Sequence, residues 1–216
     1  KPDDSQNVFK KRYGDCKGMA NLIKQMMIIA GFDARLTWIG TKHIAYDYSI
    51  PSLSVDNHMI CTVLYKGKQI YLDGTEKNIS LEEYAERIQN KETLIENGDT
   101  YIIGKIPTVQ ASQNKETFRA KLVVDGEKLK GTCKRTYLGE SRTEFQNIYN
   151  SFETDKKAEA LERYLSKNDK NNHVTSIKTS DLKSREQALT IHYELESENR
   201  LSNFDGEMYF GDAGIR

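Results

Sequence analysis

The chain has 216 residues, of which 37% are hydrophobic and 30% are charged, and it contains 12 tyrosines and 7 phenylalanines. This composition can fill the core of one large or two small domains, and it excludes a wholly disordered chain. Lysine plus arginine equals aspartate plus glutamate at 32 each, so the overall charge favours neither nucleic acid nor an anionic membrane. No apolar stretch is long enough to span a membrane. We therefore expect a globular chain with no nucleic-acid partner and no membrane span.

The three cysteines are Cys16, Cys61 and Cys133. An odd number at wide spacing fits neither a disulfide framework nor a Cys-x-x-Cys metal site, so at least one thiol should be free. We predict that Cys61 and Cys133 have no role in the chemistry. The sequence suggests no cofactor and no bound metal.

The first elements in chain order are a polar segment and a helix. Residues 1–12 predict an extended lead-in. Apolar residues then recur at intervals of three and four up to Gly31, which predicts a helix from about 16 to 30. Its wide apolar face predicts burial on most sides. Cys16 stands at the N-terminus of this helix, where free backbone N–H groups and the helix dipole favour a thiolate.

The next stretch predicts a strand, a loop and a hairpin. Residues 34–40 alternate between apolar and polar and predict a strand, residues 42–56 show no period and predict a long loop, and residues 57–75 predict a hairpin. A two-residue turn at Lys66-Gly67 places Asp73 on the same face as His58 and diagonal to it, whereas a three-residue turn places Asp73 on the opposite face. We expect the two-residue turn.

The rest of the chain predicts one further short helix, a linker and a second module. Ser80 and Glu83 form a capping box for a helix ending near residue 89. A strand covers 101–104, and the polar segment 107–115 is the expected linker. The predicted elements of the second module are strands at 117–125 and 127–138, helices at about 140–150 and 156–167, and strands at about 173–179, 187–196 and 206–210.

Cys16, His58 and Asp73 together contain the groups needed for nucleophilic catalysis. A thiolate attacks an acyl carbon, an imidazole transfers the proton, and a carboxylate fixes the imidazole tautomer. His43 is an alternative base in the aperiodic loop. A zinc site built from these four residues is conceivable but lacks closely spaced ligand pairs. We expect the Cys16 sulfur within about 3 to 4.5 Å of a ring nitrogen of His58, with the cysteine helix on the sheet face of His58, Ile60 and Leu64.

The runs RYGDCKGMANLIKQMMIIAGFDARLTWIGT and DNHMICTVLYKGKQIYLDGT resemble the transglutaminase-like superfamily. The family's cysteine, histidine and aspartate motifs match at residues 14–16, 57–58 and 72–75, in the family's order and spacing. The resemblance covers about residues 1–105. It implies an α+β fold with a papain-like core, in which a cysteine helix packs on an antiparallel sheet, followed by a second β-rich α+β module. The corresponding domains are a catalytic domain at 1–108 and an accessory domain at 109–216.

Family members carry helices before the cysteine motif, whereas only 15 residues precede Cys16 here. We therefore expect this chain to be a piece of a longer multidomain protein, with the Cys16 N–H as one oxyanion donor. The resemblance implies a thiol acyl-transfer enzyme, a transglutaminase or a cysteine protease or amidase, that acts on a protein or peptide substrate. The alternative is a catalytically silent domain that binds proteins or peptides. The resemblance further implies a bacterial periplasmic or secreted location.

Overall fold

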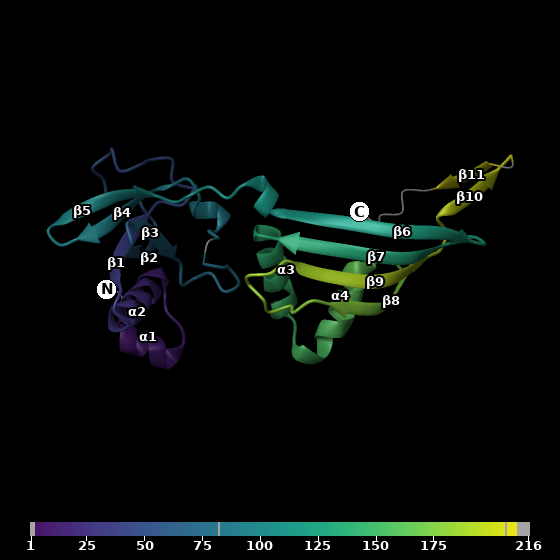
Figure 1. Cartoon of the computed structure of the whole chain (residues 1–216), viewed down its shortest axis with the longest axis horizontal. Coiled ribbons are helices and arrows are strands. Elements are labelled where there is room, and N and C mark those ends of the chain that lie inside the picture. The colour runs from purple at the N-terminus through teal and green to yellow at the C-terminus, as the bar shows by residue number, and fades with distance from the viewer. Residues whose placement is uncertain (1–2, 82, 206, 211–216) are drawn as a thin grey trace. The chain divides into compact units, whose positions relative to one another are not determined.

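The computed structural model describes residues 3–81, 83–205 and 207–210. The chain divides into two compact units, Lys1–Gln110 and Ala111–Arg216. Each unit combines helices with an antiparallel sheet of its own, as Figure 1 shows, so the predicted α+β class is confirmed. No helix in the described ranges is both long and apolar enough to cross a membrane.

The first unit is a five-stranded antiparallel sheet with two helices. The strand order is β3-β2-β1-β4-β5. Its elements are α1 (Ser5–Lys11), α2 (Cys16–Ile29), β1 (Asp33–Ile39), β2 (His58–Tyr65), β3 (Lys68–Leu72), β4 (Glu92–Asn97) and β5 (Thr100–Lys105), with a short 3-10 turn at Glu86–Ile88. The loop predicted at 42–56 contains no helix or strand.

Helix α2 begins and ends where the sequence predicts. The Asp15 carboxylate caps it by accepting a hydrogen bond of 2.7 Å from the Gly18 N–H, which satisfies one of the free donors of the first turn. Gly31 adopts a φ of +88°, a conformation that glycine reaches without steric cost. The Phe32 N–H then bonds the Met27 carbonyl at 2.9 Å and closes the C-terminus.

The β2–β3 hairpin has the predicted two-residue turn. Tyr65 pairs with Lys68, and the turn residues Lys66 and Gly67 both have positive φ angles, of 49° and 76°. Such a turn matches the right-handed twist of the flanking strands. Continued by one residue past the end of β3, this register places Asp73 opposite Ile60.

The predicted packing of the cysteine helix is wrong in two respects. Ile23 and Met27 of α2 pack against Ala34, Cys61 and Val63, so the helix covers the opposite face from the one expected. Strand parity could not decide this point because both faces of the hairpin are apolar. The other face is covered instead by the segment around the 3-10 turn Glu86–Ile88. The buried cluster on this side consists of Ile39, Ile60, Tyr71, Ala85, Ile88, Ile95 and Ile106.

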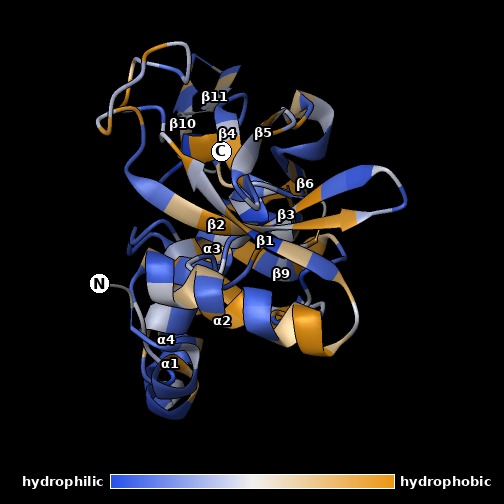
Figure 2. Cartoon of the chain, turned by 90° about the vertical axis from the view of Figure 1, so that its left-hand side faces the viewer, coloured by the Kyte–Doolittle hydropathy of each residue, from blue (hydrophilic) through white to orange (hydrophobic). Residues whose placement is uncertain are grey.

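The helix is also less buried than its sequence predicts. Met26 is 53% exposed and Ile29 is 86% exposed. Figure 2 shows the hydrophobic C-terminal end of α2 on the surface of the unit. Apolar residues can also lie on the exposed surface of a helix, so the width of the apolar face of α2 overestimated how much of this helix is buried.

Three local predictions also need correction. The lead-in forms α1 rather than an extended segment, because Asp4 caps it and Val8 is buried beneath it. The helix expected from Ser80 is reduced to the turn Glu86–Ile88, although Glu83 accepts the Ser80 N–H at 3.2 Å as the capping box requires. Strand β4 was missed entirely.

The second unit is a four-stranded antiparallel sheet in the order β6-β7-β9-β8, with a separate β10-β11 hairpin (Figure 1). Its elements are β6 (Lys115–Asp125), β7 (Lys128–Leu138), α3 (Glu140–Ser151), α4 (Lys157–Leu165), β8 (Asn172–Thr179), β9 (Leu189–Ser197), β10 (Leu201–Phe204) and β11 (Glu207–Phe210), with 3-10 turns at Ala111–Gln113 and Thr154–Lys156. Apart from β10 and the two 3-10 turns, the sequence predicts these elements.

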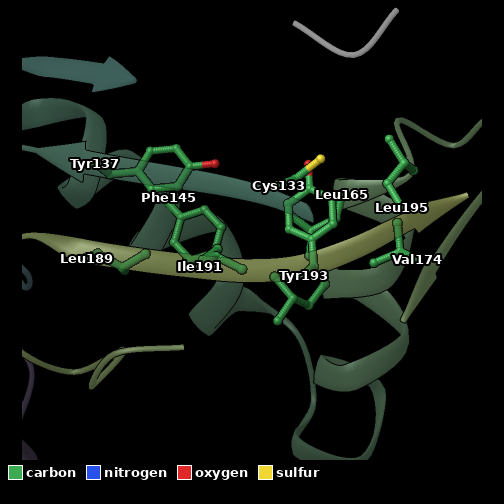
Figure 3. Packing of buried hydrophobic residues seen from close by; sticks show 10 residues of the cluster. Cys133, Tyr137, Phe145, Leu165, Val174, Leu189, Ile191, Tyr193 and Leu195 are labelled. Atoms are coloured by element: carbon green, nitrogen blue, oxygen red, sulfur yellow. The ribbon is translucent and has the colours of Figure 1, made fainter. Parts of the chain in front are cut away.

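The core of the second unit lies between the sheet and helices α3 and α4. Figure 3 shows the side chains of β7 and β9 that point into it. The Phe145 ring stacks on Tyr137 at 5.0 Å between centroids, and the Tyr137 hydroxyl lies 2.9 Å from that of Tyr164. Cys133 is buried in the same core. One face of the sheet is thereby covered by helices.

Candidate functional site

The structure brings two of the three predicted site residues into direct contact. His58 is the first residue of β2, and Asp73 directly follows β3. The His58 Nε2 lies 2.8 Å from the Asp73 Oδ2, and the two side chains are 9% and 5% exposed. The two-residue hairpin turn causes this contact, because it aligns the start of one strand with the end of the next.

Asp73 is held by more partners than the sequence suggested. Its Oδ1 accepts hydrogen bonds from the Thr75 N–H at 3.0 Å and the Thr75 hydroxyl at 2.7 Å, and its Oδ2 also lies 3.0 Å from the Arg87 guanidinium. Arg87 in turn pairs with Glu76 at 2.6 Å. Threonine two residues after aspartate was a readable turn signal. No sequence signal pointed to Arg87, since it lies beyond the loop that follows the hairpin.

The environment of Asp73 favours its charged form. Burial raises the pKa of this carboxyl, but hydrogen bonds from His58 and Thr75 and the charge of His58 outweigh burial and hold the pKa below its ordinary value of 3.8. When His58 is neutral, this carboxylate accepts its Nε2 proton. Nδ1 then has a free lone pair and can act as a base.

The lowered pKa of Asp73 predicts a pH-dependent contribution to folding. A carboxyl with a lowered folded pKa stabilises the fold above its unfolded pKa, and this stabilisation is lost as pH falls through the folded pKa. We expect Asp73→Asn to lower the free energy of unfolding near pH 7 and to have a diminishing effect below the ordinary value of 3.8. Urea unfolding across this pH range measures the difference. Asp99→Asn, at an exposed turn, is the control, and an equal pH dependence for the two variants would contradict the prediction.

The start of α2 determines the position of Cys16. It is the first residue of α2 and half-buried, and the described contacts include no hydrogen bond from its sulfur. The close approach of Gly74 to α2 brings the start of this helix toward the His58–Asp73 pair. A Cβ on Gly74 would lie 3.1 Å from the Met19 Cβ and 2.8 Å from the Ile23 Cδ1. By strand parity His58 shares the face of Ile60, whereas α2 covers the opposite face. Cys16 can therefore reach His58 only around the edge of the sheet where β2 begins, and the Cys16–His58 distance stays a prediction.

The other candidates take no part in this arrangement. All three cysteines are free. Burial raises the pKa of Cys61 to about 11 and also raises that of Cys133, which disfavours their thiolates. His43 is exposed in the loop after β1. Within residues 3–81, 83–205 and 207–210, no group of three His, Cys, Asp or Glu side chains could hold a metal ion.

The comparisons with known proteins leave the family open. No protein-family model matches the chain, and no curated protein matches it. A solved structure from Parabacteroides distasonis, named a "putative protease", is similar at 9% identity and a TM-score of 0.37. The alignment covers 99% of this chain and 42% of that one, so this chain spans less than half the length of that structure. A likeness at this level defines neither family nor function, which are argued from the site.

Proposed function

We propose that the first unit is a thiol acyl-transfer domain in which Cys16 is the nucleophile, His58 the base and Asp73 the residue that orients His58. The observation that carries this proposal is the 2.8 Å hydrogen bond between the buried His58 Nε2 and Asp73 Oδ2. A buried histidine–carboxylate pair at the edge of a sheet, next to a helix that begins with cysteine, matches the division of roles in such sites. The transglutaminase-like, papain-like core is part of the same proposal.

The proposed reaction starts with transfer of the Cys16 proton to the Nδ1 of His58. The thiolate attacks the carbonyl carbon of an amide, and the C–N bond breaks as His58 returns the proton to the departing amine. The product is a thioester on Cys16. Water then releases a carboxylic acid, or a second amine releases a new amide, and either step restores the thiol.

The N-terminus of α2 supplies electrostatic support for this reaction. The first N–H groups of a helix have no acceptor within the helix. The Gly18 N–H donates to the Asp15 carboxylate, and the Met19 N–H donates to the Asp15 carbonyl at 2.9 Å. Cys16 precedes both of these residues at the start of the helix. We assign the N–H of Cys16 as an oxyanion donor. The substrate class is a protein or peptide amide, and a bacterial envelope location stays a prediction.

Alkylation by iodoacetamide tests whether Cys16 is an activated nucleophile. We expect Cys16 to react faster than Cys61 and Cys133 at neutral pH, because both of the latter are buried. The greater exposure of Cys16 would by itself give this order of rates. The decisive comparison is therefore between the alkylation rate of Cys16 in the native chain and its rate in His58→Gln. We expect the rate at Cys16 to fall in this variant, as measured by peptide mass spectrometry.

A matched control is His43→Gln, which removes an exposed imidazole from the neighbouring loop. Equal alkylation rates at Cys16 in the native chain and in His58→Gln would contradict the proposal. That result would favour the second candidate function, a catalytically silent domain that binds proteins or peptides. The raised pKa of Cys61 and the burial of Cys133 predict that neither thiol changes its rate in either variant.

A further inference from the structure

The open face of the second sheet carries a row of basic side chains that crosses all four strands. Arg119 of β6 pairs with Lys134 of β7, Lys134 pairs with His192 of β9, and His192 pairs with Lys178 of β8. All four residues are exposed. Since neighbouring strands lie about 4.8 Å apart, the row spans about 14 Å. Its residues alternate with those of the helix-covered core, so the row lies on the face away from α3 and α4.

The pairing of Arg119 with Lys134 costs folding free energy. Like charges directly opposite each other in a sheet destabilise it. Among the described residues, no carboxylate lies within salt-bridge distance of any of the four side chains in the row. The same face does contain paired charges elsewhere, since Lys128 and Lys130 both bind Glu196 near the β6–β7 turn. The unpaired row is therefore a local feature of a chain whose net charge is zero.

A β-bulge in β8 completes the row. Thr175 pairs with Glu194, and the next pair is Lys178 with His192, so β8 contains one extra residue. A regular register would place Ile177 opposite His192. The bulge instead lets Ile177 pack against the core and brings Lys178 onto the open face. It requires Ser176 to adopt a φ of 54°, an uncommon conformation for a residue other than glycine.

The composition of the face indicates what kind of anion it fits. The described part of this face has no phenylalanine, tyrosine or tryptophan, and its rings are the imidazoles of His173 and His192, so it lacks the large aromatic platforms on which the bases of single-stranded nucleic acid stack. Threonines 117, 136 and 190 border the row on one side, and Lys121, Thr132, Glu194 and Thr175 border it on the other. A long, uniform polyanion that ran along β9 would meet Glu194 and Glu196. A short cluster of carboxylates fits the width of the row.

We infer that this row, Arg119–Lys134–His192–Lys178, binds a short acidic segment of a protein partner. The lysine ammonium groups act as point charges that accept carboxylates in many orientations, which suits a flexible run of aspartate or glutamate. The partner's negative charge offsets the repulsion within the row. This row belongs to the second unit, whereas Cys16, His58 and Asp73 belong to the first, and the inference does not depend on their chemistry.

Fluorescence anisotropy with a labelled oligoglutamate peptide at low ionic strength tests the inference, using the full chain carrying Cys16→Ser. We expect Lys134→Gln or Arg119→Gln to weaken binding about two- to fivefold each, as loss of an exposed ion pair predicts. Lys156→Gln, which removes a lysine from the turn between α3 and α4, is the control and should leave binding unchanged. We also expect Lys134→Gln to keep or raise the unfolding midpoint, because it relieves repulsion.

Comparison with other anionic ligands tests which chemical class of anion the row prefers. At matched charge, oligoglutamate should bind more tightly than a heparin fragment or an oligothymidylate. Tighter binding of either competitor would overturn the assignment to an acidic polypeptide. Absence of oligoglutamate binding, or equal weakening by Lys156→Gln, would overturn the role of the row. These readouts do not involve thiol chemistry, so their failure is distinguishable from a failure of the proposed acyl transfer.

Discussion

Replacing Asp73 with asparagine should lower the rate of acyl transfer by about 10⁴-fold, as loss of the orienting carboxylate does in a serine-protease triad. Asp73 accepts a proton from the Nε2 of His58 at 2.8 Å. An asparagine amide can donate to this nitrogen instead, which places the proton on Nδ1 and removes the lone pair needed by Cys16. The rate is measured as formation of an acyl-enzyme on Cys16 with an activated ester, followed by intact-protein mass spectrometry.

The matched control for this variant is Glu76→Gln. It makes the same acid-to-amide change three residues further along the same loop, at a carboxylate that pairs with Arg87 at 2.6 Å. We expect its acylation rate to stay within about tenfold of the native rate, since a residue that acts through Arg87 and Asp73 affects only the orientation of His58. An Asp73→Asn rate as high as that of Glu76→Gln, in a folded chain, would rule out Asp73 as the orienting residue.

Replacing Ile60 with alanine should destabilise the first unit by about 2 to 5 kcal/mol, because it leaves a cavity in a closed core. Ile60 is fully buried and packs in one cluster with Ile39, Tyr71 and Ile95. Ile60→Val should cost about 0.5 to 1.5 kcal/mol. Trp38 is the only tryptophan of the chain and lies in β1, so its fluorescence during urea unfolding reports on this unit.

Ile103→Ala provides the exposed comparison for this experiment. Ile103 lies in β5 of the same sheet and is 44% exposed, so its truncation removes less buried surface and should cost much less than that of Ile60. An equal loss of stability at the two positions would show that the cluster around Ile60 is not the core that supports His58. It would then remove the structural reason for the rigid placement of His58 next to Asp73.

The sequence alone determined the local framework of the candidate site. Periodicity and the Gly31 stop predicted α2, and the Lys66-Gly67 turn predicted the register that joins His58 to Asp73. These features depend on neighbours in the chain: helix caps, turn residues with positive φ, and the two-residue period of a strand. The hairpin and both helices of the second unit were predictable for the same reason.

The tertiary structure decided which surfaces meet. Both faces of the β2–β3 hairpin are apolar, so only the packed structure shows that α2 covers Cys61 and Val63 rather than Ile60. The helix expected after Ser80 is reduced to a short turn, because its residues cover the Ile60 cluster instead of continuing a helix. Arg87 reaches Asp73 only through that turn. Such contacts join residues far apart in the chain, and their energies depend on the partners that the fold supplies rather than on local sequence preferences.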